Sequence, residues 1–540
     1  MEPQAGLAKC CPRCSRCWQL NPPFHHVSHH SSPPPLRGVC SLIKLSHANA
    51  DNLLPAYKTQ PPPHHISSLP QTLSLPKKLR MVAFKFLLAL SLSLLVSAAV
   101  AQTREPRLTQ GQQCRFQRIS GAQPSLRLQS EGGTTELWDE RQEQFQCAGI
   151  VAMRSTIRPN GLSLPNYHPS PRLVYIERGQ GLISIMVPGC AETYQVHRGQ
   201  STMERTEPSE QQERGSVRDL HQKVHRLRQG DIVAIPSGAS HWCYNDGSED
   251  LVAVSINDVN HLSNQLDQKF RAFYLAGGVP RSGQQEQQAR ETFHNIFRAF
   301  DANLLSEAFN VPQETIRRMQ SEEEERGLIV MARERMRFVR PDEEEGEQEQ
   351  RPGRQLDNGL EETLCTMKFR TNVESRREAD IFSRQAGRVN VVDLNKLPIL
   401  KFMDLSAEKG NLYANALVSP DWSMTGHTIV YVTRGDAQIQ VVDHNGQALM
   451  NDRVNQGEMF VVPQYYTSIA RAGNNGFEWV AFKTTGSPMR SPLAGYTSVI
   501  RAMPLQVITN SYQISPNQAQ ALKMNRGSQS FLLSPGGRRS

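Results

Sequence analysis

Short apolar runs separated by turn-forming residues fill most of the chain after residue 102. Two examples are PRLVYIERGQGLISIMV at 171–187 and GDIVAIPSG at 230–238. The runs are rich in β-branched residues, and Pro, Gly and Asn stand between them. Many short strands at even spacing are typical of a β-sandwich or a β-barrel. The pattern therefore predicts a mainly β structure.

A helical spacing of apolar residues appears after Phe270. The positions that share it are Phe297, Phe300, Leu304, Leu305 and Phe309. They predict a helix, and a second helix is expected over 313–319, with Pro312 near its first turn. Farther along, residues 327–341 (GLIVMARERMRFVRP) lie between charged runs and are apolar enough to form a docked strand.

The second half of the chain repeats the first. VYIERG at 174–179 returns as VYVTRG at 430–435, and GDIVAIP at 230–236 returns as GEMFVVP at 457–463. Matching segments in a fixed order indicate an internal repeat. We therefore predict two copies of one β-barrel unit in tandem.

Each copy ends in a helical tail. LLSEAFNVPQETIRRM at 304–319 corresponds to VITNSYQISPNQAQAL at 507–522. Gly179 and Gly435 close the first matching segment of each copy and have strand-like runs on both sides. We therefore predict that each is the turn residue of a β-hairpin.

The charge changes sign along the chain. The formal net charge of all 540 residues is +8, but residues 102–358 carry 31 Lys and Arg against 36 Asp and Glu, whereas residues 359–540 carry 19 against 14. Arg is scattered among Glu and Gln without the basic stripe that phosphate binding requires, so no nucleic-acid partner is expected. The polar stretches at 195–228, 281–290 and 320–357 are predicted to be solvated loops.

A secretory signal peptide is predicted at 81–101. The sequence MVAFKFLLALSLSLLVSAAVA combines a start-capable Met81 with an apolar run and small residues, and we place the cut between Ala101 and Gln102. The run is short for a spanning helix, so no membrane association is expected after the signal is removed. If translation starts at Met1, the same run could act as a signal anchor.

Residues 1–80 show no strand or helix period and are rich in Pro, His and Ser. We predict a disordered leader, which an upstream extension of the gene model would explain. Two overlapping C-x-x-C spacings between residues 10 and 17 fit zinc ligands, but no fold is expected around them to hold a structural metal.

Five cysteines follow the signal peptide: Cys114, Cys147, Cys190, Cys243 and Cys365. An odd number in a secreted chain indicates two disulfides and one free thiol. Their spacing alone leaves the pairing open.

The repeated unit resembles the cupin barrel, whose enzymes bind a metal ion through three His and one Glu from two motifs. The second motif is complete in the first barrel, where its residues are Gly230, Pro236, Gly238, His241 and Asn245. The ligand positions of the first motif hold Tyr167, Pro169 and Val174 instead. In the second barrel the equivalent positions hold Ser423, Thr425 and Val430, and Ser468 replaces His241.

These substitutions argue against a metal enzyme. One His cannot hold a divalent metal usefully, and Pro and Val offer no donor atom. His168 and His427 lie near the ligand positions but not on them, so we predict no metal and no other cofactor. A germin-like metal oxidase or a two-barrel decarboxylase is the disfavoured alternative. A carrier that uses the emptied barrel mouth for a small molecule is a third class.

Five segments resemble the 11S globulins (legumin type), a family of seed storage proteins. They are EGGTTELWDE (131–140), FQCAGI (145–150), PGCAETYQ (188–195), NGLEETLC (358–365) and SYQISPNQAQALKMNRGS (511–528). The resemblance implies two cupin (jelly-roll β-barrel) domains in tandem and a nutrient-reservoir function without enzyme activity.

The resemblance also implies proteolytic processing between Asn358 and Gly359 by an asparaginyl endopeptidase. The implied parts are an acidic chain (102–358) with the first barrel at about 110–320 and an acidic linker at 320–358, and a basic chain (359–540) with the second barrel at about 371–525.

Disulfide pairing and assembly are implied in the same way. Cys114 would pair with Cys147 within the acidic chain and Cys190 with Cys365 between the chains, which leaves Cys243 free. The precursor would form trimers, and the cut protein would form homo- or hetero-hexamers with other 11S subunits. The implied route is the secretory pathway to the protein storage vacuole of the seed.

We expect the mature protein to contain no residue before Gln102, because signal peptidase would remove the leader with the signal peptide. Peptide mass spectrometry of the purified protein checks this. A peptide from residues 1–80 in the mature protein would contradict it.

Overall fold

The computed structural model describes residues 116–190, 194–195, 220–278, 293–321, 326–336, 365–374 and 379–536. All of them belong to the unit Ser91–Ser540. The predicted leader (1–80), the predicted signal peptide from Met81 to Ala101, and Gln102, Cys114, Asn358 and Gly359 lie outside the described residues.

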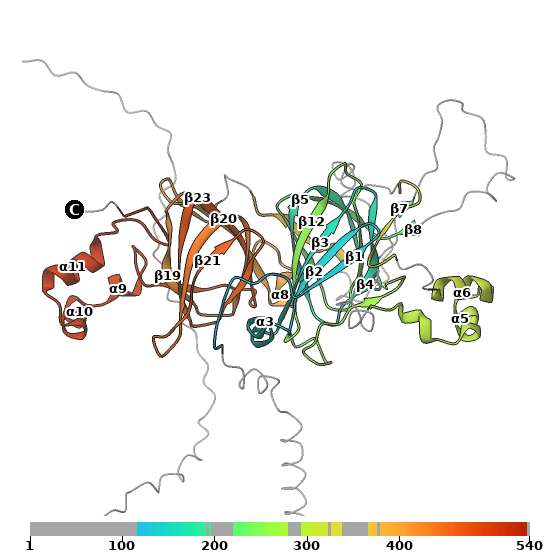
Figure 1. The fold of residues 1–540 in the computed structure, drawn as a ribbon, viewed down its shortest axis with the longest axis horizontal. Helices are drawn as coiled ribbons and strands as arrows, with labels where there is room; N and C mark the ends of the chain where they lie inside the picture. Colours follow the sequence, from blue (N-terminus) through green and yellow to red (C-terminus); the bar gives the residue numbers. More distant parts are fainter. Residues whose placement is uncertain are drawn as a thin grey trace, which may run out of the picture. The chain divides into compact units, whose positions relative to one another are not determined.

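The first barrel is built from two antiparallel sheets (Figure 1). The strands of the larger sheet, in spatial order, are β1 (Leu126–Ser130), β2 (Gly133–Trp138), β3 (Ile150–Ile157), β12 (Leu251–Asp258), β5 (Arg172–Arg178), β10 (Asp231–Ile235) and β15 (Arg370–Asn372). Those of the smaller sheet are β13 (Phe273–Tyr274), β4 (Gly161–Tyr167), β11 (Ser240–Tyr244), β6 (Gln180–Met186) and β9 (Val224–Arg228), with β14 (Ile329–Met331) also paired to β4. A separate ribbon joins β7 (Tyr194–Gln195) to β8 (Leu220–His221). β8 and β9 lie in the stretch 195–228 that was predicted to be a solvated loop, so that prediction is wrong for these residues, whereas β14 confirms the docked strand expected within 327–341.

The second barrel repeats this plan with longer strands. Its strands form one ten-stranded sheet because β20 (Thr428–Val442) and β23 (Thr467–Lys483) change partner strands along their length. The other strands are β16 (Ile381–Ser383), β17 (Gly387–Val392), β18 (Ser406–Leu412), β19 (Leu417–Ser423), β21 (Ala448–Asn455), β22 (Met459–Val462), β24 (Arg490–Pro492) and β25 (Leu532–Leu533).

The helices are few and short, and each barrel carries an arm of helices (Figure 1). Those within the barrels are α3 (Glu143–Ala148) and α8 (Leu400–Met403). The arm of the first barrel contains η1 (Ile296–Ala299), α5 (Ala302–Phe309) and α6 (Gln313–Gln320), and that of the second contains α9 (Val499–Ala502), α10 (Leu505–Tyr512) and α11 (Pro516–Met524). The predicted fold class, mainly β with helical tails, is confirmed.

The first helical segment is interrupted where one continuous helix was expected. Asp301 lies between η1 and α5 in an extended conformation, and its carboxylate accepts hydrogen bonds from the backbone N–H groups of Asn303 and Leu304. An N-cap of this kind starts a new helix. Pro312 is the N-cap of α6, close to its predicted place in the first turn.

The prediction that Gly179 and Gly435 are hairpin turn residues is wrong. Gly179 joins β5 to β6, which belong to different sheets, and Gly435 lies within β20 at a register irregularity. Both have positive φ, 83° and 74°. An added Cβ would lie 2.5 Å from the carbonyl oxygen of Asp250 or 2.2 Å from that of Gly476. The two glycines therefore mark the corner at which the chain passes between the two halves of a barrel.

The segment that follows the predicted cut completes the first barrel. Asp231, Ile232 and Val233 of β10 pair with β15, although we expected the second barrel to begin near residue 371. Phe369 and Val373 flank β15 and are buried in the core of the first barrel. The edge of that barrel is thus covered by the part of the chain predicted to become the basic chain.

At the start of the described chain, residues 119–122 contribute backbone to the second barrel. Ala122 and Met459 exchange two backbone hydrogen bonds of 2.8 and 3.1 Å. The Ile119 N–H donates to the Leu449 carbonyl over 3.0 Å, and the Ile119 side chain is fully buried in the core of the second barrel. Each barrel therefore contains backbone from the other half of the sequence.

One apolar core runs from the first barrel into the second. It includes Trp138 and Ile256 of the first barrel together with Leu400 of α8 and Phe482 of β23. A second cluster fills the interior of the second barrel. Burial of apolar surface between the barrels holds them together at about 25 cal/mol per Å².

Candidate functional site

Most residues of the cupin-type motif in the first barrel shape the backbone or form hydrogen bonds with it. Gly230 turns the chain between β9 and β10 with φ 84°, and its N–H donates to the Ile176 carbonyl over 2.9 Å. The Gly238 N–H donates to the His168 carbonyl over 2.7 Å. The amide nitrogen of Asn245 donates to two backbone carbonyls at 2.8 Å, those of Ile157 and Glu249.

His241 is the one motif residue whose side chain enters a cluster of rings. It lies on β11, is buried, and its ring centroid is 5.8 Å from that of His168. The His168 Nδ1 lies 3.0 Å from the Arg271 carbonyl, so Nδ1 carries the proton of the neutral ring. Burial and then Arg172 lower the pKa of His241 to about 3, which keeps this histidine uncharged.

Sequence reasoning missed Arg172, which is buried beside the two histidines. Its Nη1 lies 3.4 Å from His241 Nε2, and its Nε donates to the Asn257 side chain over 3.0 Å. The guanidinium contributes positive charge next to the histidines, where a metal ion would be repelled. Among the described residues, no group of three or more His, Cys, Asp or Glu could hold a metal ion.

The second barrel has a buried charge cluster where the first has rings. Glu408 on β18 accepts a hydrogen bond from Arg490, lies 3.4 Å from Lys483 Nζ, and accepts from Trp479 Nε1 at 3.4 Å. Burial opposes the charge of this carboxylate, but the two cations outweigh it and lower its pKa to about 2. Asp421 lies 3.9 Å from Arg490 Nη1, and burial raises its pKa to about 6.

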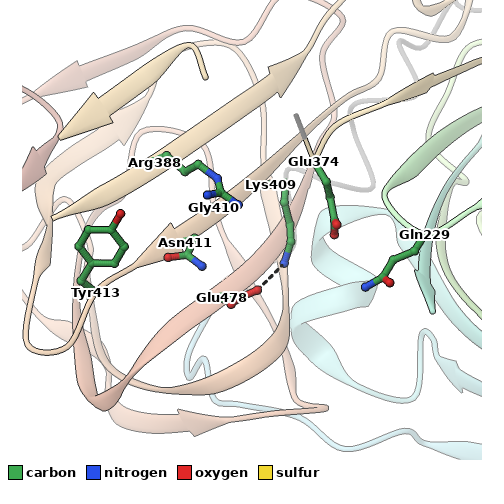
Figure 2. A pocket seen from close by; sticks show the side chains of 8 residues that line it. All are labelled: Gln229, Glu374, Arg388, Lys409, Gly410, Asn411, Tyr413 and Glu478. Atoms are coloured by element: carbon green, nitrogen blue, oxygen red, sulfur yellow. Dashed lines mark hydrogen bonds and ion pairs between the residues drawn. The ribbon is translucent and has the colours of Figure 1, made fainter. Parts of the chain in front are cut away.

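The polar pocket between the barrels has a volume of about 350 Å³ (Figure 2). Lys409 points into it between Glu374 and Glu478, and its Nζ lies 3.5 Å from Glu478 and 2.7 Å from the Thr433 hydroxyl. Glu374 accepts a hydrogen bond of 2.8 Å from the Tyr175 hydroxyl. The contacts of Glu374 and Lys409 place this pocket in the seam between the barrels.

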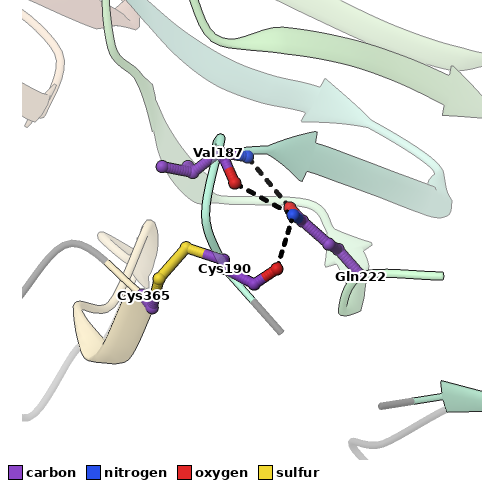
Figure 3. Close-up of a disulfide and its surroundings, with 4 residues drawn as sticks. All are labelled: Val187, Cys190, Gln222 and Cys365. Carbon is purple, nitrogen blue, oxygen red and sulfur yellow. Dashed lines mark hydrogen bonds between the residues drawn. A yellow bond between two sulfur atoms is a disulfide. The ribbon is translucent and has the colours of Figure 1, made fainter. Parts of the chain in front are cut away.

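A disulfide joins Cys190 to Cys365 across 175 residues of sequence (Figure 3). The Gln222 side chain anchors its base: Oε1 accepts from the Val187 N–H, and Nε2 donates to the carbonyls of Val187 and Cys190, at 2.9–3.1 Å. Cys147 is disulfide-bonded as well, and its predicted partner lies outside the described residues. Cys243 is free, and burial raises the pKa of its thiol to about 12, which keeps the thiol protonated at neutral pH.

Comparison with known proteins identifies the family. Cupin regions match at residues 119–281 and 372–520. Over 460 residues the chain is 96% identical to 11S globulin seed storage protein 2 of Sesamum indicum, an alignment that covers 85% of this chain and 100% of that protein. The chain belongs to the 11S globulin family of seed storage proteins.

More distant relatives agree with this assignment. This chain is 42% identical to 11S globulin seed storage protein Ana o 2.0101 of Anacardium occidentale, over 77% of this chain and 92% of that protein. The crystal structure of the coconut allergen cocosin matches with a TM-score of 0.68 and 37% identity, covering 78% of this chain and 100% of that chain.

These relatives are storage globulins and not enzymes, so the 11S globulin is a seed storage protein and the germin-like enzyme alternative is wrong. No helix among the described residues is long and apolar enough to cross a membrane.

We expect Glu408→Gln to destabilise the second barrel by about 3 kcal/mol at pH 7, because the buried Lys483 and the half-buried Arg490 lose their shared partner. The two cations hold the pKa of Glu408 in the folded state at about 2, below its usual value of 4.5. Its contribution to stability is therefore complete above pH 4.5 and is lost as the pH falls toward 2. The urea midpoints of wild type and variant should differ at pH 7, and the difference should shrink steadily as the pH falls from 4.5 toward 2.

Glu314→Gln is the matched control, because Glu314 pairs with Arg318 on the exposed face of α6. This substitution should change the free energy of unfolding by less than about 0.5 kcal/mol, so its urea midpoint should stay close to that of wild type. Equal midpoints for wild type and Glu408→Gln at pH 7 would contradict a structural role for the cluster.

Proposed function

We propose that this storage globulin is made as a secreted precursor and cut between Asn358 and Gly359 by an asparaginyl endopeptidase. The acidic and basic chains then remain joined and assemble into hexamers in the protein storage vacuole of the seed. The observation that carries the proposal is the Cys190–Cys365 disulfide, which connects the two sides of the proposed cut.

The seam between the barrels supports retention of both chains. β15 is hydrogen-bonded to β10, and Ala122 is hydrogen-bonded to Met459, so each product of the cut supplies backbone to the other product's barrel. The Tyr431 hydroxyl also reaches the Glu177 carboxylate at 3.3 Å, and the amide oxygen of Gln144 accepts from the Val461 N–H at 3.2 Å. Separation would expose these groups and the shared core to water.

The helical arms support assembly into rings. In the single chain their apolar side chains are exposed: Phe300, Leu304 and Phe309 in the first arm, and Val507, Tyr512, Leu522 and Met524 in the second. Contiguous exposed apolar side chains mark interaction surfaces. Because the two arms belong to successive repeats, the first arm of one subunit can contact the second arm of the next. A heterologous contact of this kind closes a ring, which fits the proposed trimer.

We expect Asn358→Gln to block the cut, because an asparaginyl endopeptidase reads the Asn side chain. Co-expression with the endopeptidase, followed by reducing electrophoresis, should show two chains for wild type and one for the variant. Size-exclusion chromatography should find the variant as trimers. Asn445→Gln is the control: Asn445-Gly446 is also an Asn-Gly pair, in the turn between β20 and β21, and its substitution should leave processing intact. Two chains from Asn358→Gln would refute the assigned junction.

We expect Cys365→Ser to leave the cut and the barrels intact but to allow the chains to separate in denaturant without reductant. In the uncut precursor the disulfide closes a loop worth about 5 kcal/mol against unfolding in the chain-entropy model. Without denaturant the exchanged strands should still hold the cut chains together. Non-reducing electrophoresis and native size-exclusion chromatography test the two statements.

Cys243→Ser controls for loss of a thiol, since Cys243 is free, and its chains should stay linked. If the Cys365→Ser chains stay linked in denaturant, the disulfide assignment fails. If they separate under native conditions, the exchanged strands do not hold them.

A further inference from the structure

The interior of the second barrel contains a cavity of about 80 Å³. Its apolar lining includes Val430, Ile439, Phe460 and Trp479. Its polar lining includes the buried charge cluster: Glu408, Asp421, Lys483 and Arg490. A lining that combines apolar walls with a few polar groups is the usual composition of a small-molecule site.

The repeat explains why the space lies in this barrel. In the first barrel His241 is paired with Asn166 across β11 and β4, and in the second Ser468 is paired with Asp421 across β23 and β19. The small Ser468 side chain lines the cavity. At the equivalent place in the first barrel, the His241 ring contacts that of His168, which in turn lies 5.5 Å from the Phe270 ring.

Two of the four charged groups have unused hydrogen-bonding capacity. The Lys483 ammonium has three N–H donors, and its acceptors are the Thr428 hydroxyl at 3.3 Å and Glu408 at 3.4 Å. For Asp421 the nearest ion-pair atom among the described residues is Arg490 Nη1 at 3.9 Å, beyond hydrogen-bond distance. The cavity therefore offers one strong acceptor and one strong donor.

The four charges also cancel. Glu408 and Asp421 carry one negative charge each above pH 6, and Lys483 and Arg490 one positive charge each. An additional ion of either sign would leave a net charge in a buried space, which is costly. A neutral polar group could meet both Asp421 and Lys483 without that cost.

We propose that this cavity binds a small neutral amphipathic molecule, whose polar group donates to Asp421 and accepts from Lys483 while its hydrocarbon part contacts the apolar walls. A primary amide meets both requirements. The volume of about 80 Å³ limits the ligand to few non-hydrogen atoms. This binding is independent of storage and of processing.

Three probes of similar size test the charge balance: propionamide, propionate and n-propylammonium. Saturation-transfer NMR on the full-length protein at pH 8 gives their dissociation constants, with Asp421 ionised above its pKa of about 6. We expect propionamide to bind at least about tenfold more tightly than either ion, a difference of 1.4 kcal/mol. Equal affinities, or no binding of propionamide, would overturn the proposal.

Ser468→Phe fills the cavity and should abolish propionamide binding. Asn451→Phe is the matched control, because Asn451 lies on the exposed face of β21, and it should bind as wild type does. Unchanged binding in Ser468→Phe would place the ligand elsewhere and overturn the proposal.

Asp421→Asn tests the charge argument without changing the shape of the side chain. It removes one negative charge and leaves a net positive lining, so the preference should reverse: propionate should tighten and propionamide weaken, each by about tenfold. This test stands even if Ser468→Phe fails to fold. An unchanged order of affinities would show that the four charges do not select the ligand.

Discussion

The exchange of backbone hydrogen bonds between the two barrels is the constraint on which the rest of the structure depends. Residues 369–373 cover the β10 edge of the first barrel, and residues 119–122 extend into the second. An uncovered sheet edge would present unpaired N–H and C=O groups to other chains. Because each half supplies the missing backbone of the other, neither barrel is complete alone, and the continuous core between them follows from the same arrangement.

The interiors of the two barrels are filled by different kinds of side chain. In the first, Arg172 lies beside His241, and aromatic and imidazole rings fill the space. In the second, Glu408 is held by Arg490 and Lys483. Buried polar groups are tolerated only when hydrogen-bonded or paired. The repeat therefore preserves the barrel while the chemistry of its interior differs between the two copies.

The sequence predicted the repeat, the β class and the helical arms because they rest on local patterns of apolar residues. It did not predict β15 as part of the first barrel, since strand pairing at a distance leaves no local signal. Gly179 and Gly435 were predicted to be hairpin turn residues because a glycine between two strand-like runs is expected both in a hairpin and at a corner where the chain changes sheet. The local sequence does not distinguish these two structures. The cluster around Glu408 was missed for a similar reason: Glu408, Lys483 and Arg490 are far apart in sequence and meet only in the folded barrel.

The Cys190–Cys365 disulfide lies where the two long polar segments meet the ordered barrel. Cys190 precedes the polar stretch at 195–228, and Cys365 follows the acidic one at 320–357. Gln222, near the end of the first stretch, hydrogen-bonds to Val187 and Cys190 at its start. The disulfide and Gln222 together hold the chain that follows β6 against the chain that precedes β9 and against Cys365. Both stretches also contribute strands to the first barrel, β9 in one and β14 in the other. Changes of length are therefore compatible with the fold only between these strands, where the entropy of closing a longer connection rises slowly with its length.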